Sequence, residues 1–366
     1  MTIKNIIIPA MLLLTAVEST AQKEFSDYFY DSTLYVAFSS KTENQKFKFL
    51  EIYSYAYQPT WNGTAKLPAK SPTDSDRRIA MLSGEGDTIY NFAYSSLMDE
   101  WLTVCDTRND YDNKVYNEIH TLPYPKNEVS IVLQQRDSNG KYRTYHSEIF
   151  KPHSPMREMP PKDFLDQKPQ EEIPLLTGGH NKSKVDLVIL PQAYDSTSMH
   201  RFDSVARLFV DRLFEYEPFK SNKDKFNIRM LKIYSRNTNK NSLDFQSGVF
   251  GMDRYIGAWS FTYTYLRAMK LPCDGLIVFI NSDEYGGGGI YNHYAVFTGN
   301  HPLSVEGMIH EFGHSFANLE DEYGGDVFQS KEQPNSHCIM RTLSEHQFCE
   351  KCQQKILQSI KYWTGE

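Results

Sequence analysis

Two histidines four residues apart on a predicted helix are the residues of this sequence whose types and spacing point most directly to chemistry. They belong to the segment His310-Glu311-Phe312-Gly313-His314, which follows an apolar turn. Side chains at positions i and i+4 lie on the same face of a helix, so both imidazoles can bind one Zn²⁺ ion. The segment therefore predicts a catalytic zinc site in which Glu311 takes the proton of the attacking water. The alternative is that both histidines lie on a solvent-exposed helix face.

A catalytic zinc site needs a third protein ligand, and acidic candidates follow the helix directly. Asn318 tolerates the left-handed backbone conformation that ends a helix, so the chain can turn back toward the metal there. We predict that Asp321, three residues further on, is the third ligand. Other carboxylates remain as alternatives, some beside Asp321 and some further downstream: Glu320, Glu322, Glu345 and Glu350.

The cysteines are odd in number, so at least one thiol must stay unpaired within the chain. They are Cys105, Cys273, Cys338, Cys349 and Cys352. The last two have the C-x-x-C spacing of half a zinc ribbon, but a ribbon needs a second pair at matching spacing. We predict instead a local disulfide that joins Cys338 to Cys349 or to Cys352.

The N-terminus has the features of an export signal. Lys4 supplies a positive charge, residues 6–17 are an apolar run too short to span a bilayer, and Ser19 and Ala21 fit a cleavage site. Residues 1–21 are therefore predicted to be a signal peptide, the alternative being a buried N-terminal element. No later segment reads as a membrane span. We expect the mature chain to be secreted, or to be held in a periplasm or at the cell surface.

Residues 22–150 are predicted to form a β-sandwich accessory domain. Aromatic residues make up 14% of the chain, which favours β structure. This region shows no convincing helical periodicity. The pair Asn139-Gly140 indicates a hairpin, because both residues tolerate positive φ. The strand patterns cover 33–38, 47–53, 129–134 and 142–149.

Residues 151–175 hold a cluster of prolines among charged residues, which predicts an exposed linker. Beyond the linker, residues 176–366 alternate between strand and helix patterns. This alternation predicts an α/β catalytic domain. The strand patterns cover 185–190, 226–234 and 275–280, and the helix patterns cover 202–214 and 305–319.

The charge pattern and a glycine-rich segment bear on the partners. The net charge is −7 with Lys and Arg spread along the chain, so nucleic acid is not an expected partner.

Residues 286–289 are all glycine, but the segment lacks the other residues of a phosphate-binding loop. We predict an edge or loop beside the active-site cleft where a peptide substrate adds as a strand, with Gly287 and Gly288 as candidate contacts. His293 either contacts substrate there or is structural.

The sequence resembles the metzincin metallopeptidases. The zinc motif is followed by Cys338-Ile339-Met340, and Met340 matches the methionine of the Met-turn, an apolar floor beneath the zinc ligands of that family. On its own, a buried methionine is ordinary core filling. The resemblance implies a metzincin-like fold for the second domain.

The resemblance is closer to one branch, the IgA-peptidase (igalysin) family of bacteria. It implies a zinc peptidase with ligands at His310 and His314, a catalytic Glu311 and an acidic third ligand at Asp321. The matching segments are 185–190, 285–291 and 310–323, together with 90–106 and 122–136 for an N-terminal β domain.

The sequence departs from the family pattern at three places. Asn318 stands where a glycine is expected at the helix end, and residues 191–194 replace an Asp-Gly-Tyr type of turn. The usual metzincin spacing from the second histidine to the third ligand falls on Glu320. The first two departures remove no metal ligand, whereas the third makes Glu320 the alternative to Asp321 as the third ligand.

The leading interpretation is an exported zinc endopeptidase that cleaves protein or peptide substrates. A zinc amidase or deacetylase would use the same water, and cleavage of a folded protein rather than a small amide separates the two. A third interpretation is a surface module whose β domain binds glycan or protein beside a vestigial zinc site. The presence of all the expected catalytic residue types argues against the third.

Overall fold

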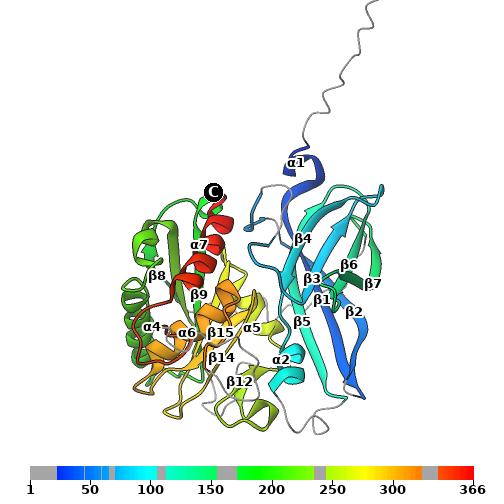
Figure 1. The fold of residues 1–366 in the computed structure, drawn as a ribbon. Coiled ribbons are helices and arrows are strands. Elements are labelled where there is room, and N and C mark those ends of the chain that lie inside the picture. The colour runs from blue at the N-terminus through cyan, green and yellow to red at the C-terminus, as the bar shows by residue number, and fades with distance from the viewer. Residues whose placement is uncertain are drawn as a thin grey trace, which may run out of the picture.

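The chain forms a β-rich N-terminal region followed by a mixed α/β region, as the strand and helix patterns predicted (Figure 1). The computed structural model describes residues 23–44, 46–58, 60–65, 71–104, 113–154, 171–234, 245–323 and 337–366. The predicted signal peptide, Cys105 and most of the predicted linker lie outside these ranges.

The N-terminal region is a sandwich of two antiparallel sheets, with the strand orders β2-β1-β5 and β4-β3-β6-β7. The predicted hairpin at Asn139-Gly140 joins β6 to β7, and Gly140 has a φ of 76°. A short helix, α1 (Phe25–Tyr28), precedes the sandwich. The strands are β1 (Phe29–Glu43), β2 (Lys46–Gln58), β3 (Arg77–Leu82), β4 (Thr88–Tyr94), β5 (Val115–Pro125), β6 (Val129–Arg136) and β7 (Tyr142–Phe150).

Strand β1 is buried on both of its faces. Because successive side chains of a strand point to opposite sides, Leu34, Val36 and Phe38 pack inside the sandwich. Tyr35 and Ala37 point the other way and pack against the second region. The β2-β1-β5 sheet therefore joins two hydrophobic cores, and the sandwich is continuous with the α/β region.

The second region is built on a sheet with the strand order β14-β15-β13-β9-β10-β8. The inner pairs are parallel, and β8 and β14 are antiparallel to their neighbours. Residues 171–175, expected in the linker, belong to β8, because the backbone of that strand pairs with β10. The strands are β8 (Glu171–Thr177), β9 (Val185–Gln192), β10 (Phe226–Lys232), β13 (Gly275–Ile280), β14 (Gly287–Ile290) and β15 (Tyr294–Thr298).

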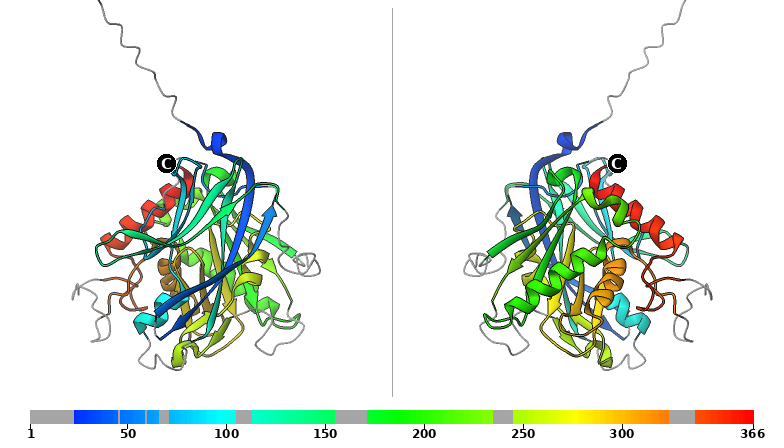
Figure 2. Two further views of the ribbon diagram at one scale, coloured as in Figure 1. Left: turned by 90° about the vertical axis from the view of Figure 1, so that its right-hand side faces the viewer. Right: turned by 90° about the vertical axis from the view of Figure 1, so that its left-hand side faces the viewer.

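Helices cover one face of this sheet and the sandwich covers much of the other. Val185, Leu187 and Ile189 of β9 face the helices, whereas Val188 and Leu190 face the sandwich. The helical layer holds α4 (Met199–Leu213), α6 (Ser304–Ala317) and α7 (Glu350–Thr364), seen in front in the right-hand view of Figure 2. Shorter elements complete the region: β11 (Phe245–Ser247), β12 (Ile256–Ala258), α5 (Thr262–Ala268) and the 3₁₀ turns η1 (Asn181–Ser183), η2 (Lys220–Lys225) and η3 (Val249–Gly251).

Helix α2 (Leu97–Val104) lies in the β-rich region, where the sequence analysis found no helical pattern. Leu97, Met98 and Trp101 are buried in the core shared with the α/β region. Its Asp99 accepts two hydrogen bonds of 2.6 Å from the buried guanidinium of Arg77 in β3. Tertiary packing and this ion pair stabilise the helix, which is too short to show a helical periodicity in the sequence.

The disulfide predicted for Cys338 is absent. Cys338, Cys349 and Cys352, like Cys273, are free thiols in the described part of the chain. The first three still lie together, where they share a cluster with the carboxylate of Glu322.

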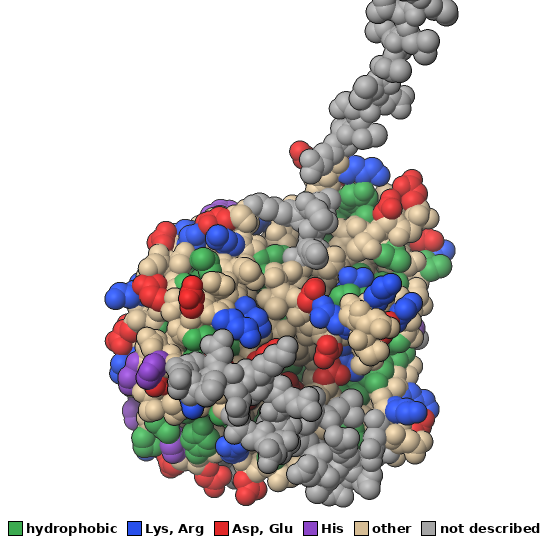
Figure 3. Space-filling view, viewed as in Figure 1, with side chains coloured by type: hydrophobic (Ala, Val, Ile, Leu, Met, Phe, Trp, Pro, Cys, Tyr) green, Lys and Arg blue, Asp and Glu red, His purple; other side chains and the backbone are tan. Residues whose placement is uncertain are grey.

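Acidic and basic side chains are interspersed on the face drawn in Figure 3. Among the residues that the structure describes, no helix combines the length and apolar character needed to cross a bilayer.

The buried ion pair between Arg77 and Asp99 generates a stability prediction. Arg77→Ala should lower the free energy of unfolding by about 3–5 kcal/mol, because it removes a fully buried side chain and takes the ion pair away from the largely buried carboxylate of Asp99. Denaturant unfolding of the whole chain measures the change. The control is Arg143→Ala, which removes the exposed partner of Asp137 in the same sandwich and should leave the midpoint nearly unchanged. Equal effects of the two variants would contradict the structural role of the buried pair.

Candidate metal centre

Helix α6 carries both histidines and Glu311, over nearly the range predicted from the sequence. It is buried almost all round, and two glycines make the close fit possible. A Cβ on Gly307 would lie 2.2 Å from the ring of Phe297 in β15, and a Cβ on Gly313 would lie 2.9 Å from Met340 Sδ. The sheet and the segment around Met340 therefore fix where the histidines stand.

Three donor atoms converge at the C-terminal half of α6. The Nε2 atoms of His310 and His314 are 3.1 Å apart. Oδ1 of Asp321 lies 3.1 Å from the first and 3.2 Å from the second. Donors of a tetrahedral zinc site with bonds of about 2.0–2.1 Å are about 3.3 Å apart, so this triangle has the size of a metal site.

Backbone carbonyls determine which nitrogen of each ring is available. His310 Nδ1 lies 3.0 Å from the carbonyl oxygen of Ile339, and His314 Nδ1 lies 2.6 Å from that of Leu319. A carbonyl oxygen only accepts, so each Nδ1 carries the proton and donates it. Both Nε2 atoms therefore present lone pairs toward each other, the arrangement found in metal-bound histidines.

The two Nε2 lone pairs and the Asp321 carboxylate repel one another unless a cation lies between them. Asp321 Oδ1 is buried and has no hydrogen-bond donor of its own. Without a metal, only a proton on an Nε2 atom relieves the repulsion. Burial lowers the pKa of His314, but the Asp321 carboxylate outweighs burial and raises it to about 10. Two imidazoles and a carboxylate are a donor set that fits Zn²⁺ with one position left for water.

The turn after α6 brings Asp321 to the histidines. Asn318 adopts the left-handed conformation, with φ 49° and ψ 46°, so it replaces the glycine expected there without strain at the helix end. The amide of Leu319 then donates to the carbonyl of Gly313 at 3.3 Å, and the chain folds back. The hydroxyl of Tyr323 donates to Asp321 Oδ2 at 2.7 Å, which leaves Oδ1 facing the histidines.

The other candidate third ligands lie elsewhere. Glu320 and Glu350 are exposed. Glu322 directs its carboxylate to the sulfurs of two cysteines, and Glu345 lies beside the exposed His337. Among the described carboxylates predicted as ligands, the structure brings Asp321 alone into the histidine cluster.

Met340 is fully buried beneath α6 and touches Gly313, between the two histidines in sequence. It belongs to a tight turn in which the amide of Arg341 donates to the carbonyl of Cys338 at 2.9 Å. The same turn supplies the Ile339 carbonyl that orients His310. This is the position that the resemblance to a Met-turn predicts for Met340.

Glu311 lies beside the histidines on the side of the edge strand β14. Its Oε1 would be 3.0 Å from a Cβ on Gly287. Burial raises the pKa of Glu311, His310 and His314 oppose this effect, and Asp321 adds to it. A raised pKa makes a carboxylate a stronger base, which suits a group that takes up a proton.

The glycines of β14 let other elements approach closely. A Cβ on Gly289 would lie 2.3 Å from the carbonyl oxygen of Glu311, and one on Gly288 would lie 2.3 Å from that of Ile256. The amide of Gly287 donates to the carbonyl of Arg254 at 3.0 Å. The chain just before and within β12 therefore already runs along β14. The geometry assigns Gly287 and Gly288 to close packing, not to an open strand position for a peptide.

His293 does not face the metal centre. Its side chain is buried at the junction of the two regions, against Phe261 and His120 and 3.9 Å from the carboxylate of Glu118. Burial lowers its pKa to about 3, so the imidazole is neutral at neutral pH. The structural alternative for His293 fits this position, and a contact with substrate does not.

Three residues that lie near Glu311 carry no signal in the sequence: Glu100, Arg254 and Tyr255. Burial raises the pKa of Glu100, in α2, to about 7, and the charge of His314 opposes that shift. Arg254 is exposed, and its charge lowers the pKa of Glu311. Burial raises the pKa of Tyr255, and the charge of Glu311 adds to that rise. No spacing pattern links these residues to the zinc motif, because folding alone brings α2 and the segment before β12 to it.

The contact between β14 and α6 generates a second prediction. Gly289→Ala should reduce bound metal and activity together, because its Cβ would push the backbone at Glu311 and His314 away from the sheet. Metal analysis and peptide cleavage measure both effects. Gly84→Ala is the control, since its Cβ meets no atom within 4 Å. Full metal content in Gly289→Ala would show that this contact does not position the centre.

Comparison with known proteins now gives the family. Residues 173–332 match the family model described as IgA Peptidase M64, and residues 24–147 match the one described as Peptidase M64 N-terminus. A search of curated proteins found no match. The two matches cover most of the chain and correspond to the α/β region and the sandwich. The chain therefore belongs to the IgA peptidase M64 family, carries that family's N-terminal domain, and is a metallopeptidase that acts on protein substrates.

Proposed function

We propose that this metallopeptidase is a zinc endopeptidase with His310, His314 and Asp321 as the metal ligands and Glu311 as the general base. The observation that carries the proposal is the convergence of the two Nε2 lone pairs on Asp321 Oδ1, with both Nδ1 protons committed to carbonyls. Imidazole and carboxylate donors in a tetrahedral arrangement favour Zn²⁺ over Mg²⁺ or Ca²⁺.

The chain's own residues supply the proton transfers of peptide hydrolysis. Zinc held by this donor set would polarise a water molecule and the scissile carbonyl, and would lower the pKa of the water toward about 7. Glu311 accepts the proton of that water as the water oxygen bonds to the carbonyl carbon. Glu311 then gives the proton to the amide nitrogen as the C–N bond breaks. Its half-buried position limits the access of bulk water to that proton.

We also propose that the protein works outside the cytoplasm, after removal of residues 1–21. The charged, apolar and small-residue segments of the N-terminus support this location. Mass spectrometry of the chain recovered outside the cytoplasm should find Gln22 as its first residue. Recovery of a chain that still begins at Met1 from the cytoplasm alone would overturn export.

The catalytic assignment predicts separate effects for Glu311 and Asp321. Glu311→Gln should keep the metal and lower kcat/KM on a peptide library by about 10²- to 10⁴-fold, because the ligands stay and the base is lost. Asp321→Ala should lose both metal and cleavage. Glu320→Ala is the matched control, since this neighbouring carboxylate is exposed and should change neither quantity.

Three results would overturn the proposal. Cleavage that survives Glu311→Gln would remove Glu311 from the mechanism. Hydrolysis of small amides without any cleavage of peptides would favour a zinc amidase instead. Binding without hydrolysis would favour a surface module.

A further inference from the structure

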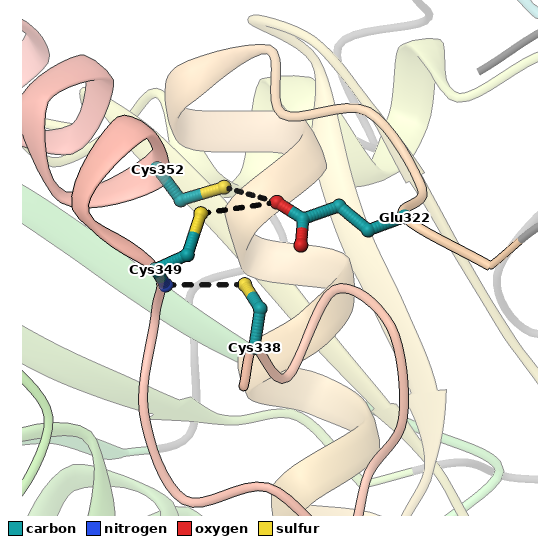
Figure 4. Close-up of side chains that lie close together, drawn as sticks. All are labelled: Glu322, Cys338, Cys349 and Cys352. Atoms are coloured by element: carbon teal, nitrogen blue, oxygen red, sulfur yellow. Dashed lines mark hydrogen bonds between the residues drawn. The ribbon is translucent and has the colours of Figure 1, made fainter. Parts of the chain in front are cut away.

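A second group of metal-ligand side chains lies next to the proposed catalytic centre and takes no part in it. It consists of Glu322, Cys338, Cys349 and Cys352, whose donor atoms all lie within 4.8 Å of one another (Figure 4). Cys338 begins the turn that holds Met340, whereas Cys349 and Cys352 lie at the start of α7. Three segments that are separate in the sequence thus direct their side chains to one point.

The contacts within this cluster are those of ligands around a common centre. Glu322 Oε1 lies 3.1 Å from Cys349 Sγ and 3.3 Å from Cys352 Sγ. The backbone amide of Cys349 donates to Cys338 Sγ at 3.2 Å. Cys338 and Cys352 are buried. An amide that donates to a sulfur stabilises the thiolate, which is the form that binds metal.

A disulfide explains this arrangement less well than a metal does. A bond between any two of the sulfurs would leave the third thiol without a sulfur partner. It would also remove at least one of the two thiol protons that Glu322 Oε1 now accepts, so the carboxylate would face a sulfur atom that cannot donate to it. A cation balances the carboxylate and the thiolates together.

The donor set identifies the class of metal. Three sulfurs and one oxygen make a closed set of four, as in structural zinc sites. Sulfur atoms bound to zinc at about 2.3 Å in a tetrahedron are about 3.8 Å apart, which the observed cluster accommodates. Thiolates are poor ligands for Mg²⁺ and Ca²⁺. We propose that Glu322, Cys338, Cys349 and Cys352 bind a second, structural Zn²⁺ ion.

The second zinc would hold together the segments that shape the first centre. Glu322 follows Asp321 directly, and its amide donates to the carbonyl of Met340 at 2.9 Å. Cys338 precedes Ile339, whose carbonyl orients His310. The second site is therefore a positioning site for Asp321 and His310, a role that rests on the catalytic centre proposed above. Its occupancy by zinc does not rest on that proposal.

Cobalt substitution separates the two sites in the full chain. The protein is purified in reductant, stripped of metal, and titrated with Co²⁺, while zinc content is measured on an unstripped sample. The native chain should hold about two zinc ions, and its cobalt form should show the intense thiolate-to-cobalt charge-transfer absorption that imidazole and carboxylate ligands do not give. Cys349→Ser should lower this absorption, because it removes one of the three thiolates, and Cys273→Ser, which alters a free thiol outside the cluster, should keep it in full.

The double variant His310→Ala/His314→Ala makes failure of either site distinguishable. It should lose about one zinc ion and all cleavage but keep the charge-transfer absorption. Glu322→Gln keeps the sulfurs and should weaken cobalt binding while preserving the absorption, which tests the cluster even if Cys349→Ser does not fold. Absence of the absorption from the native chain, or a disulfide among the three cysteines in its mass spectrum, would overturn the second zinc site.

Discussion

Two backbone carbonyls decide what the histidines of this chain can do. The oxygens of Ile339 and Leu319 take the Nδ1 protons of His310 and His314, and in doing so they turn both Nε2 lone pairs toward Asp321. A helix alone would place the rings on one face but would leave their rotation and their tautomers free. The residues packed around α6 hold those two carbonyls in place.

The sandwich also helps to hold the metal centre in place. Strand β1 contributes alternate side chains to the sandwich core and to the core beneath the catalytic sheet. The side-chain amide of Asn318 donates to the carbonyl of Asp74 at 3.0 Å, so the helix end at the metal centre is tied to the N-terminal region. We therefore expect the two regions to unfold together, because neither can be removed without exposing a shared core.

Local patterns in the sequence predicted the elements that have a clear hydrophobic periodicity or a characteristic residue. They missed the elements whose stability depends on partners far away in the sequence. The buried strand at β9, the helix α6 and the left-handed turn at Asn318 follow from residue type and spacing. Helix α2 and the strand β8 did not, because a short helix held by Arg77 and an edge strand held by β10 carry no periodic signal. The Cys338 cluster was misread as a disulfide, because Glu322 and the cysteines meet only after the chain has folded.

Anomalous diffraction at the zinc absorption edge, from crystals of the native chain, is the most direct test of the central claim. The proposed centre requires a zinc peak about 2.0–2.2 Å from Nε2 of His310, Nε2 of His314 and Oδ1 of Asp321. Both Nδ1 atoms should remain hydrogen-bonded to the Ile339 and Leu319 carbonyls. Absence of a peak within this triangle, with Asp321 hydrogen-bonded to a protonated imidazole instead, would contradict it.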